Sequence, residues 1–287
     1  MKKIITLALA ALMLIAMLGA FASCKKNENG DEKQVDYVKV KLTNEQYAYG
    51  VDKNNPELLA TVNEVLEEIK ENGKLDEIVN KYFSNDEANF QYYPAGTEDS
   101  TKNQLVVATN TPFSPFEEKD GDRYCGIDIE IAAMIAEKLG AELVIKDMNF
   151  SSILTAVETG KADIAMAGLT VSAEREQQVT FSNTYYEASQ VIIYKAGDET
   201  FANCTTAAEV EAILNGMNSD TIIGYQNGTT GGLYVEGDID WEFPGFPVTA
   251  KGYSSASTAV QALINGQIDY VVVDEGPAQI IVNSINN

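Results

Sequence analysis

The chain has 287 residues and carries 43 acidic against 20 basic residues, a formal net charge of −23. Such an excess of negative charge repels a phosphate backbone, so we do not expect nucleic-acid binding. The chain contains no histidine, which excludes histidine-based catalytic arrangements and histidine-ligated metal sites. We expect no catalytic residue, no metal and no cofactor.

The amino terminus carries an export signal. Two lysines precede an apolar run over residues 4–22, and Ser23 and Cys24 end that run. A small residue directly before a cysteine, followed by a polar segment, resembles a bacterial lipoprotein processing site. This predicts a signal peptide over 1–23, lipid attachment at Cys24 and a tether over 24–34. An uncleaved membrane anchor and plain secretion are the alternatives.

Residues 36–83 predict two strands followed by two helices. Alternating apolar residues favour strands over 36–42 and 46–51, and Pro56 opens a helix whose apolar positions keep helical spacing. A second helix follows over 75–83. Residues 84–104 show no periodicity and are predicted to be a linker.

The next stretch alternates strands and helices. A buried strand over 105–108 leads into an aromatic, proline-rich loop, in which Phe113 is either one wall of a site or a core residue. A helix over 128–139 and a strand over 143–145 follow. Phe150 then stands at a strand's carboxyl end, which is where open α/β sheets bind ligands.

Residues 168–176 predict an anion site. Gly168 ends the apolar strand over 163–167, Ser172 can cap a short helix, and Arg175 falls in the first turn of that helix. Free amide groups and a planar guanidinium together suit a carboxylate. The alternative is that Arg175 is a solvated surface residue.

A second half repeats the layout of residues 151–168. Residues 254–274 again hold a serine pair, a Thr-Ala-Val triplet, a helix-ending glycine, an aspartate and an apolar strand. Asp274 ends its strand as Gly168 ends the first, so it is a candidate for holding a ligand's ammonium, or else a helix cap. The glycine-rich loop over 227–232 lacks the Lys-Ser/Thr ending of a phosphate loop.

Further motifs run through the chain in a fixed order. They are residues 109–116, Gly126-Ile127-Asp128-Ile129-Glu130-Ile131, Met148-Asn149-Phe150, Gly168-Leu169-Thr170 with Arg175, Phe181-Ser182 and Val273-Asp274. Together they resemble the polar amino acid family of bacterial solute-binding proteins, the extracellular receptors of ABC importers. The resemblance covers nearly the whole mature chain. It implies an α/β, two-lobed periplasmic-binding-protein-like (type II) fold with two hinge crossovers that closes around one amino acid.

The resemblance also implies which residues bind the backbone of that amino acid. Arg175 would hold the α-carboxylate, assisted by the amide groups of Thr170 and Thr230. The carbonyl of Gly168, the hydroxyl of Thr170 and the carboxylate of Asp274 would hold the α-ammonium.

Four further residues would then surround the ligand's side chain. Phe113 and Phe150 would pack on either side of it, and Asn110 and Gln226 would contact its far end and so determine which side chain is accepted. Relatives that bind cationic amino acids usually carry an acidic residue at the Asn110 position, and an uncharged amide cannot neutralise a buried cation. We therefore expect a neutral polar, glutamine-like ligand, with a basic amino acid or cystine as the alternative.

The order of the segments departs from the family. Residues 46–83 look like the family's carboxyl-terminal portion, yet here they precede the rest, which indicates a circular permutation. The expected domains are lobe 1 over 43–83 and 105–188, a linker over 84–104, and lobe 2 over 35–42 and 189–287.

The sequence thus predicts a monomeric receptor anchored by a lipid to the outer face of the bacterial cell membrane. It would capture a free L-amino acid by lobe closure and deliver it to ABC transporter permease subunits. The alternative from another class is an enzyme on the same scaffold, a dehydratase acting on amino acid precursors.

Overall fold

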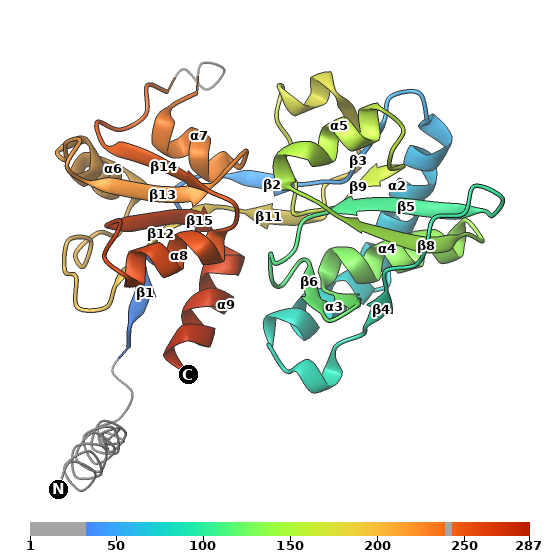
Figure 1. Cartoon of the computed structure of the whole chain (residues 1–287), viewed down its shortest axis with the longest axis horizontal. Coiled ribbons are helices and arrows are strands. Elements are labelled where there is room, and N and C mark those ends of the chain that lie inside the picture. Colours follow the sequence, from blue (N-terminus) through green and yellow to red (C-terminus); the bar gives the residue numbers. More distant parts are fainter. Residues whose placement is uncertain (1–32, 239–242) are drawn as a thin grey trace, which may run out of the picture. The chain divides into compact units, whose positions relative to one another are not determined.

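The computed structural model describes residues 33–238 and 243–287 (Figure 1). The predicted signal peptide over 1–23, the lipid attachment site Cys24 and most of the predicted tether lie outside the described residues. Within the described part of the chain, no helix is both long and apolar enough to cross a membrane.

The first of two five-stranded sheets, with its helices, is called lobe 1. Helices α2, α3 and α4 cover one face of its sheet and α5 the other (Figure 1). In the order of pairing, the strands are β10 (Val179–Phe181), β3 (Gly50–Asp52), β9 (Ile164–Ala165), β5 (Gln104–Thr109) and β8 (Glu142–Asp147). The helices are α2 (Pro56–Glu71), α3 (Lys74–Phe83), α4 (Ile127–Lys138) and α5 (Ile153–Glu158).

The second five-stranded sheet, with its helices, is called lobe 2. Helices α8 and α9 lie on one face of its sheet, and α6 and α7 on the other (Figure 1). In the order of pairing, the strands are β1 (Val35–Tyr37), β12 (Gln190–Lys195), β15 (Tyr270–Asp274), β13 (Ile222–Gln226) and β14 (Thr249–Tyr253). The helices are α6 (Ala207–Asn215), α7 (Thr230–Glu236), α8 (Ala256–Ile264) and α9 (Glu275–Asn286). The predicted two-lobed α/β fold is confirmed.

Two chain segments cross between the lobes and pair with each other. Strand β2 (Glu45–Tyr47) runs antiparallel to β11 (Tyr186–Ala188). The prediction of a single strand over 46–51 is wrong, because the chain changes partners after Tyr47. Strand β2 pairs with β11, whereas β3 inserts between β10 and β9 of lobe 1. Alternating apolar residues cannot reveal such a change of partner, since both pieces are buried.

The internal repeat places equivalent residues at equivalent points of the two lobes. Gly160 and Gly266 follow α5 and α8 with φ of +68° and +71°, a left-handed conformation that glycine adopts at little cost. Asp163 Oδ2 accepts a bond from the Val106 amide (2.7 Å), and Asp269 Oδ2 accepts one from the Ile222 amide (2.8 Å). Each aspartate therefore binds the backbone of the neighbouring parallel strand, and the strand that follows it leads to a pocket residue, Gly168 in lobe 1 and Asp274 in lobe 2.

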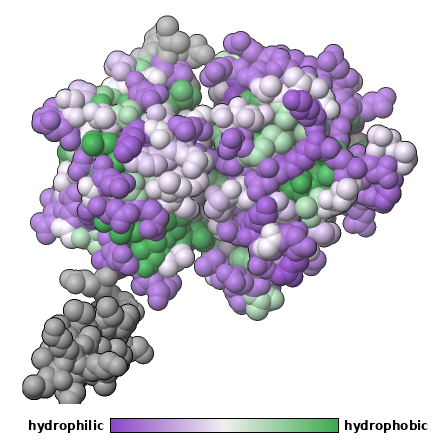
Figure 2. All heavy atoms as spheres, viewed as in Figure 1, coloured by the Kyte–Doolittle hydropathy of each residue, from purple (hydrophilic) through white to green (hydrophobic). Residues whose placement is uncertain are grey.

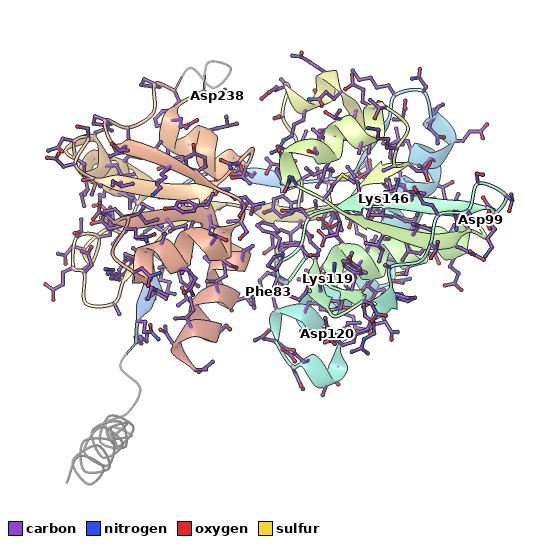
Figure 3. The ribbon with its side chains drawn as sticks, in the orientation of Figure 1. Phe83, Asp99, Lys119, Asp120, Lys146 and Asp238 are labelled. Carbon is purple, nitrogen blue, oxygen red and sulfur yellow. The ribbon has the colours of Figure 1, made fainter. Side chains whose placement is uncertain are left out.

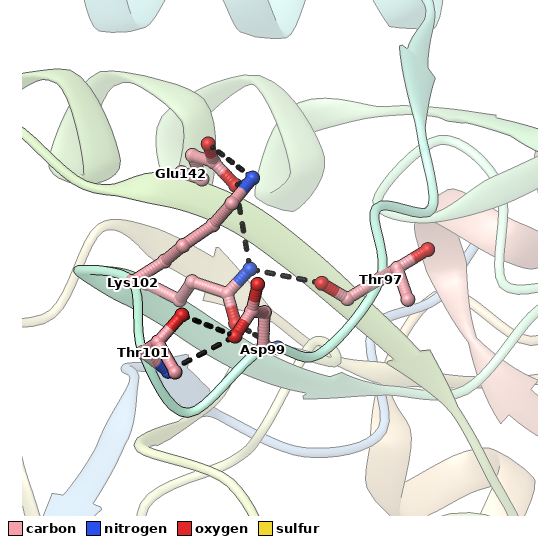
Figure 4. Close-up of polar contacts among 6 residues, drawn as sticks. Thr97, Asp99, Thr101, Lys102 and Glu142 are labelled. Atoms are coloured by element: carbon pink, nitrogen blue, oxygen red, sulfur yellow. Dashed lines mark hydrogen bonds and ion pairs between the residues drawn. The ribbon is translucent and has the colours of Figure 1, made fainter.

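The predicted linker over 84–104 is fastened to lobe 1. It contains a short 3-10 helix (Glu87–Asn89) and strand β4 (Tyr93–Pro94), which pairs with β7 (Arg123–Cys125), itself paired with β6 (Glu118–Asp120). Asp99 Oδ1 accepts bonds from the amide and hydroxyl of Thr101, and Lys102 forms an ion pair with Glu142 (Figure 4). The distance between Lys102 Nζ and Glu142 Oε1 is 2.9 Å. These contacts hold the chain beside β8 as it enters β5.

Aromatic side chains join the lobes below the crossovers. Phe83, at the end of α3, is labelled in Figure 3. Its ring stacks on that of Tyr186 with the ring centroids 6.0 Å apart. It also lies so close to Gly276 of α9 that a Cβ at this glycine would come within 3.2 Å of it. The visible surface is mainly hydrophilic, with an apolar patch over α8 and α9 (Figure 2). Cys125 and Cys204 are both free thiols.

Candidate functional site

The nine residues that the resemblance selected all line one pocket between the lobes. The cavity that they enclose has a volume of about 10 Å³, close to that of one water-sized sphere, so the lining side chains fill most of the site in this structure. Two residues that sequence reasoning missed, Glu117 and Thr229, also line it. The predicted residues are Asn110, Phe113, Phe150, Gly168, Thr170, Arg175, Gln226, Thr230 and Asp274.

Arg175 is buried in this pocket, so the solvated alternative is wrong. Its side chain is 8 % exposed, and Ser172 Oγ accepts a bond from its amide at 3.2 Å, although the helix is only a 3-10 turn over Arg175–Gln177. Nη1 donates to the Thr170 carbonyl (2.8 Å) and Nη2 to the Gly228 carbonyl of the other lobe (3.1 Å). Burial lowers the pKa of the guanidinium, and the nearby carboxylate of Glu45 opposes that shift.

Asp274 ends β15 and directly precedes α9, but its side chain makes no capping bond to that helix. Its Oδ1 instead accepts bonds from the Tyr47 hydroxyl (2.5 Å) and from Gln190 Nε2 (3.0 Å). These two donors hold the carboxylate in place and leave Oδ2 for a cation. Burial, and then the charge of Glu45, raises the pKa of Asp274 to about 7.

Phe113 and Gly168 are in close contact. Phe113 is 9 % exposed and lines the pocket, so it is both a buried residue and a wall of the site. Gly168 has φ of +54°, and a Cβ at this position would lie 2.7 Å from Cε1 of Phe113. Only a glycine lets the strand end so close to the ring, and its amide donates to Asp128 Oδ2 at 2.9 Å.

The amide side chains of Asn110 and Gln226 bind each other across the pocket. Gln226 Nε2 donates to Asn110 Oδ1 at 2.7 Å, and Asn110 Nδ2 donates to the Met148 carbonyl at 2.7 Å. Gln226 Oε1 accepts a bond from the Ala256 amide at 3.3 Å. Both amides thus have protein partners already and link loop 109–116 of lobe 1 to lobe 2.

Glu117 is a buried carboxylate in the wall of the pocket. It is fully buried, and neither Oε1 nor Oε2 has a hydrogen-bond partner among the described residues. Its backbone pairs with Phe113 in a tight turn, with the Phe113 amide 2.8 Å from the Glu117 carbonyl, so that both side chains reach the pocket. Burial, and then the charge of Asp128, raises the pKa of Glu117 well above its ordinary range. In the sequence, the one indication that Glu117 is buried is its position directly after the core residue Phe116.

The glycine-rich loop serves close packing. A Cβ at Gly231 would lie 3.0 Å from Gln190 Oε1, and one at Gly232 would lie 2.8 Å from the Tyr225 ring. These glycines let α7 begin directly beside the sheet, with the Thr230 side chain in the pocket. Among residues 33–238 and 243–287, no cluster of three or more acidic or cysteine side chains could hold a metal ion.

Comparison with known proteins identifies the family of the chain. The family model for bacterial extracellular solute-binding proteins, family 3, matches residues 6–85 and 105–275. The arginine-binding extracellular protein ArtP of Bacillus subtilis is 39 % identical over 97 residues, 34 % of this chain and 38 % of ArtP. ABC transporter arginine-binding protein 1 of Escherichia coli is 29 % identical over 61 % of this chain and 65 % of that protein.

A solved structure agrees with these matches. An ancestral arginine-binding protein bound to arginine superposes with a TM-score of 0.55 and 33 % identity, covering 65 % of this chain and 76 % of its own. The chain thus spans 38 % and 65 % of the length of the two curated relatives.

Proposed function

This chain belongs to the bacterial extracellular solute-binding proteins of family 3, and on that premise we propose that it is an extracytoplasmic receptor for a free amino acid. One observation carries the proposal: Arg175 of lobe 1 and Asp274 of lobe 2 are buried in the same pocket. A guanidinium and a carboxylate facing one small space match the α-carboxylate and α-ammonium of an amino acid.

The mechanism is lobe closure around the ligand. The α-carboxylate binds the Arg175 guanidinium and the helix-start amide of Thr230, and the α-ammonium binds Asp274 Oδ2 and the Thr170 hydroxyl. Because these groups belong to different lobes, the ligand contacts all of them only in the closed protein. This difference in contacts supplies the greater affinity of the closed state. No bond is made or broken, and the ligand is released unchanged to ABC permease subunits.

For the ligand's side chain we propose a positive charge in place of the expected glutamine-like amide. The expectation of a neutral ligand rested on Asn110, whose amide group is already bound to Gln226 and Met148. The carboxylate of Glu117 also lines the pocket, and neither of its oxygens has a hydrogen-bond partner among the described residues. An isolated buried carboxylate is costly, and a cationic ligand group would compensate it.

The charges in the pocket support the same choice. Arg175 contributes one positive charge, and Asp274 and Glu117 contribute two negative ones once ionised. An amino acid with a cationic side chain presents the complementary set of one negative and two positive charges. Both named relatives are described as arginine-binding, which agrees with this choice.

The test is calorimetry with arginine, lysine, histidine and glutamine, followed by mass spectrometry of what the protein retains. We expect the basic amino acids to bind more tightly than glutamine and to be recovered unchanged. Recovery of a dehydrated product would indicate the enzymatic alternative, and retention of no amino acid would contradict the receptor.

A variant pair tests the role of Glu117. Glu117→Gln should weaken arginine binding by about 100-fold or more, because breaking a buried ion pair costs on the order of 3 kcal/mol. The affinity for glutamine should change far less. The matched control is Glu118→Gln, at the adjacent acidic residue, which does not line this pocket. If the unmodified protein prefers glutamine and Glu117→Gln leaves arginine affinity unchanged, the ligand is neutral.

We also propose that the chain is circularly permuted within one molecule, as a monomer. Residues 43–83 supply β3 of the lobe 1 sheet and the helices that pack on α4. Lobe 2 begins near residue 35 and ends near residue 287, and these two points of the chain are adjacent. Asn286 Oδ1 accepts a bond from the Gln34 amide (2.9 Å), and Asn286 Nδ2 donates to the Val35 carbonyl (2.8 Å). A chain in the family's order would connect at this point. With Cys24 lipidated at the outer face of the membrane, the tether would enter through lobe 2.

A further inference from the structure

Glu45 is a buried carboxylate at the crossover between the lobes, and it does not line the ligand pocket. It is 5 % exposed and stands at the start of β2. Its Oε1 accepts bonds from the Thr43 hydroxyl (2.6 Å) and Gln190 Nε2 (3.1 Å). Its Oε2 accepts bonds from the hydroxyls of Thr170 (2.7 Å) and Thr230 (2.8 Å). One oxygen atom therefore binds a threonine from each lobe.

These bonds determine whether the two threonine hydroxyls can donate or accept further hydrogen bonds. A hydroxyl carries a single proton, and both hydroxyls donate theirs to Glu45. Each can then only accept a further hydrogen bond. The Thr230 oxygen also lies 3.0 Å from Gln190 Nε2, whose two N–H groups are shared between this oxygen and the carboxylates of Glu45 and Asp274. The Thr170 oxygen, which faces the pocket, is left to accept a bond from a ligand's N–H group.

Glu45 also ties together the charged groups that surround the ligand's backbone. Gln190 Nε2 donates to both Glu45 Oε1 (3.1 Å) and Asp274 Oδ1 (3.0 Å), so one amide holds the two carboxylates. Arg175 donates to the carbonyl of Thr170, the residue whose hydroxyl binds Glu45. Both the ammonium and the carboxylate subsites thus depend on the same crossover residue.

We propose that Glu45 is a positioning residue that makes the Thr170 hydroxyl an acceptor for the ligand's α-ammonium and joins the two lobes through Thr170 and Thr230. This inference rests on the proposed function, because it assigns the α-amino selectivity of that same pocket. It also links selectivity to closure: separating the lobes must break one of the two bonds to Oε2, and a buried carboxylate that loses a donor is destabilised.

The test compares arginine with 5-guanidinopentanoate, the same molecule without its α-amino group. In Glu45→Gln the amide nitrogen can replace Oε2 and donate to Thr170, whose oxygen is then occupied. Calorimetry gives the preference of the protein as the dissociation constant of the analogue divided by that of arginine. We expect this ratio to fall at least tenfold in Glu45→Gln. The change should disappear in a Thr170→Val background, because both substitutions remove the same acceptor.

The control is Thr43→Val, which removes a donor to the other oxygen of Glu45 at a residue outside the pocket. It should leave the preference within threefold. If Glu45→Gln lowers the affinities for arginine and for the analogue by the same factor, the role of Glu45 is merely structural and the proposal is overturned. If Glu45→Gln does not fold, Thr170→Val and Thr170→Ser replace it: the valine variant should lose the preference and the serine variant should keep it. Failure of the unmodified protein to bind either compound would instead contradict the proposed function.

Discussion

Arg175→Ala should abolish ligand capture while leaving the protein folded. In the structure the guanidinium binds the carbonyls of Thr170 and Gly228 at 2.8 and 3.1 Å, which directs its fork across the pocket from lobe 1 to lobe 2. The substitution removes a charge-assisted, two-bond contact with the ligand's carboxylate. Such a contact in a desolvated site contributes roughly 3 kcal/mol or more, so affinity should fall by at least about 150-fold.

Arg175→Lys separates the effect of charge from that of geometry. Lysine keeps the positive charge beside Glu45 and Asp274 but cannot form two parallel bonds, so its affinity should lie between those of the alanine variant and the unmodified protein. Calorimetry with arginine measures all three proteins. The melting temperature of each unliganded variant controls for folding and should shift by only a few degrees, since roughly 1 kcal/mol corresponds to about 2–4 °C in a domain of this size. If Arg175→Ala binds arginine with an affinity within threefold of that of the unmodified protein, Arg175 does not belong to the binding site.

Binding should weaken as the pH falls below about 7, because Asp274 has a pKa raised to about 7 and must be ionised to hold an ammonium group. In the unliganded protein the same shift acts in the opposite direction: the folded state binds this proton more tightly than the unfolded chain, so the contribution to stability falls as the pH rises from about 4 to 7. Equal affinities by calorimetry at pH 5.5 and pH 8 would contradict this assignment. Moving residues 35–83 to follow Asn287 through a short linker should give a folded, ligand-binding monomer, whereas deleting them should give insoluble protein, and a soluble deletion variant that still binds would exclude the permutation.

Several parts of the fold could be predicted from the sequence because their causes are local. Pro56 begins α2 as expected, and the side chain of Asn55 accepts a bond from the Leu58 amide at 3.1 Å. Glycines end the repeated helices with positive φ, where a side chain would be strained. The positions of Asp274 at the end of an apolar strand, and of Arg175 in the turn that follows another, could also be predicted, because the carboxyl ends of the strands in such sheets meet at a common edge.

The sequence by itself therefore determined the fold class, the strand ends that meet at the pocket and the presence of an arginine and an aspartate there. Only the tertiary structure decided which other charged residues are buried with them. Glu45 begins a three-residue strand that carries no local sign of burial, and Asn110 meets Gln226 from far along the chain. Glu117 follows a core residue, but only the fold shows that its carboxylate is buried in the pocket. A carboxylate's environment depends on partners brought together by the two lobes, and periodicity within one segment carries no information about such partners.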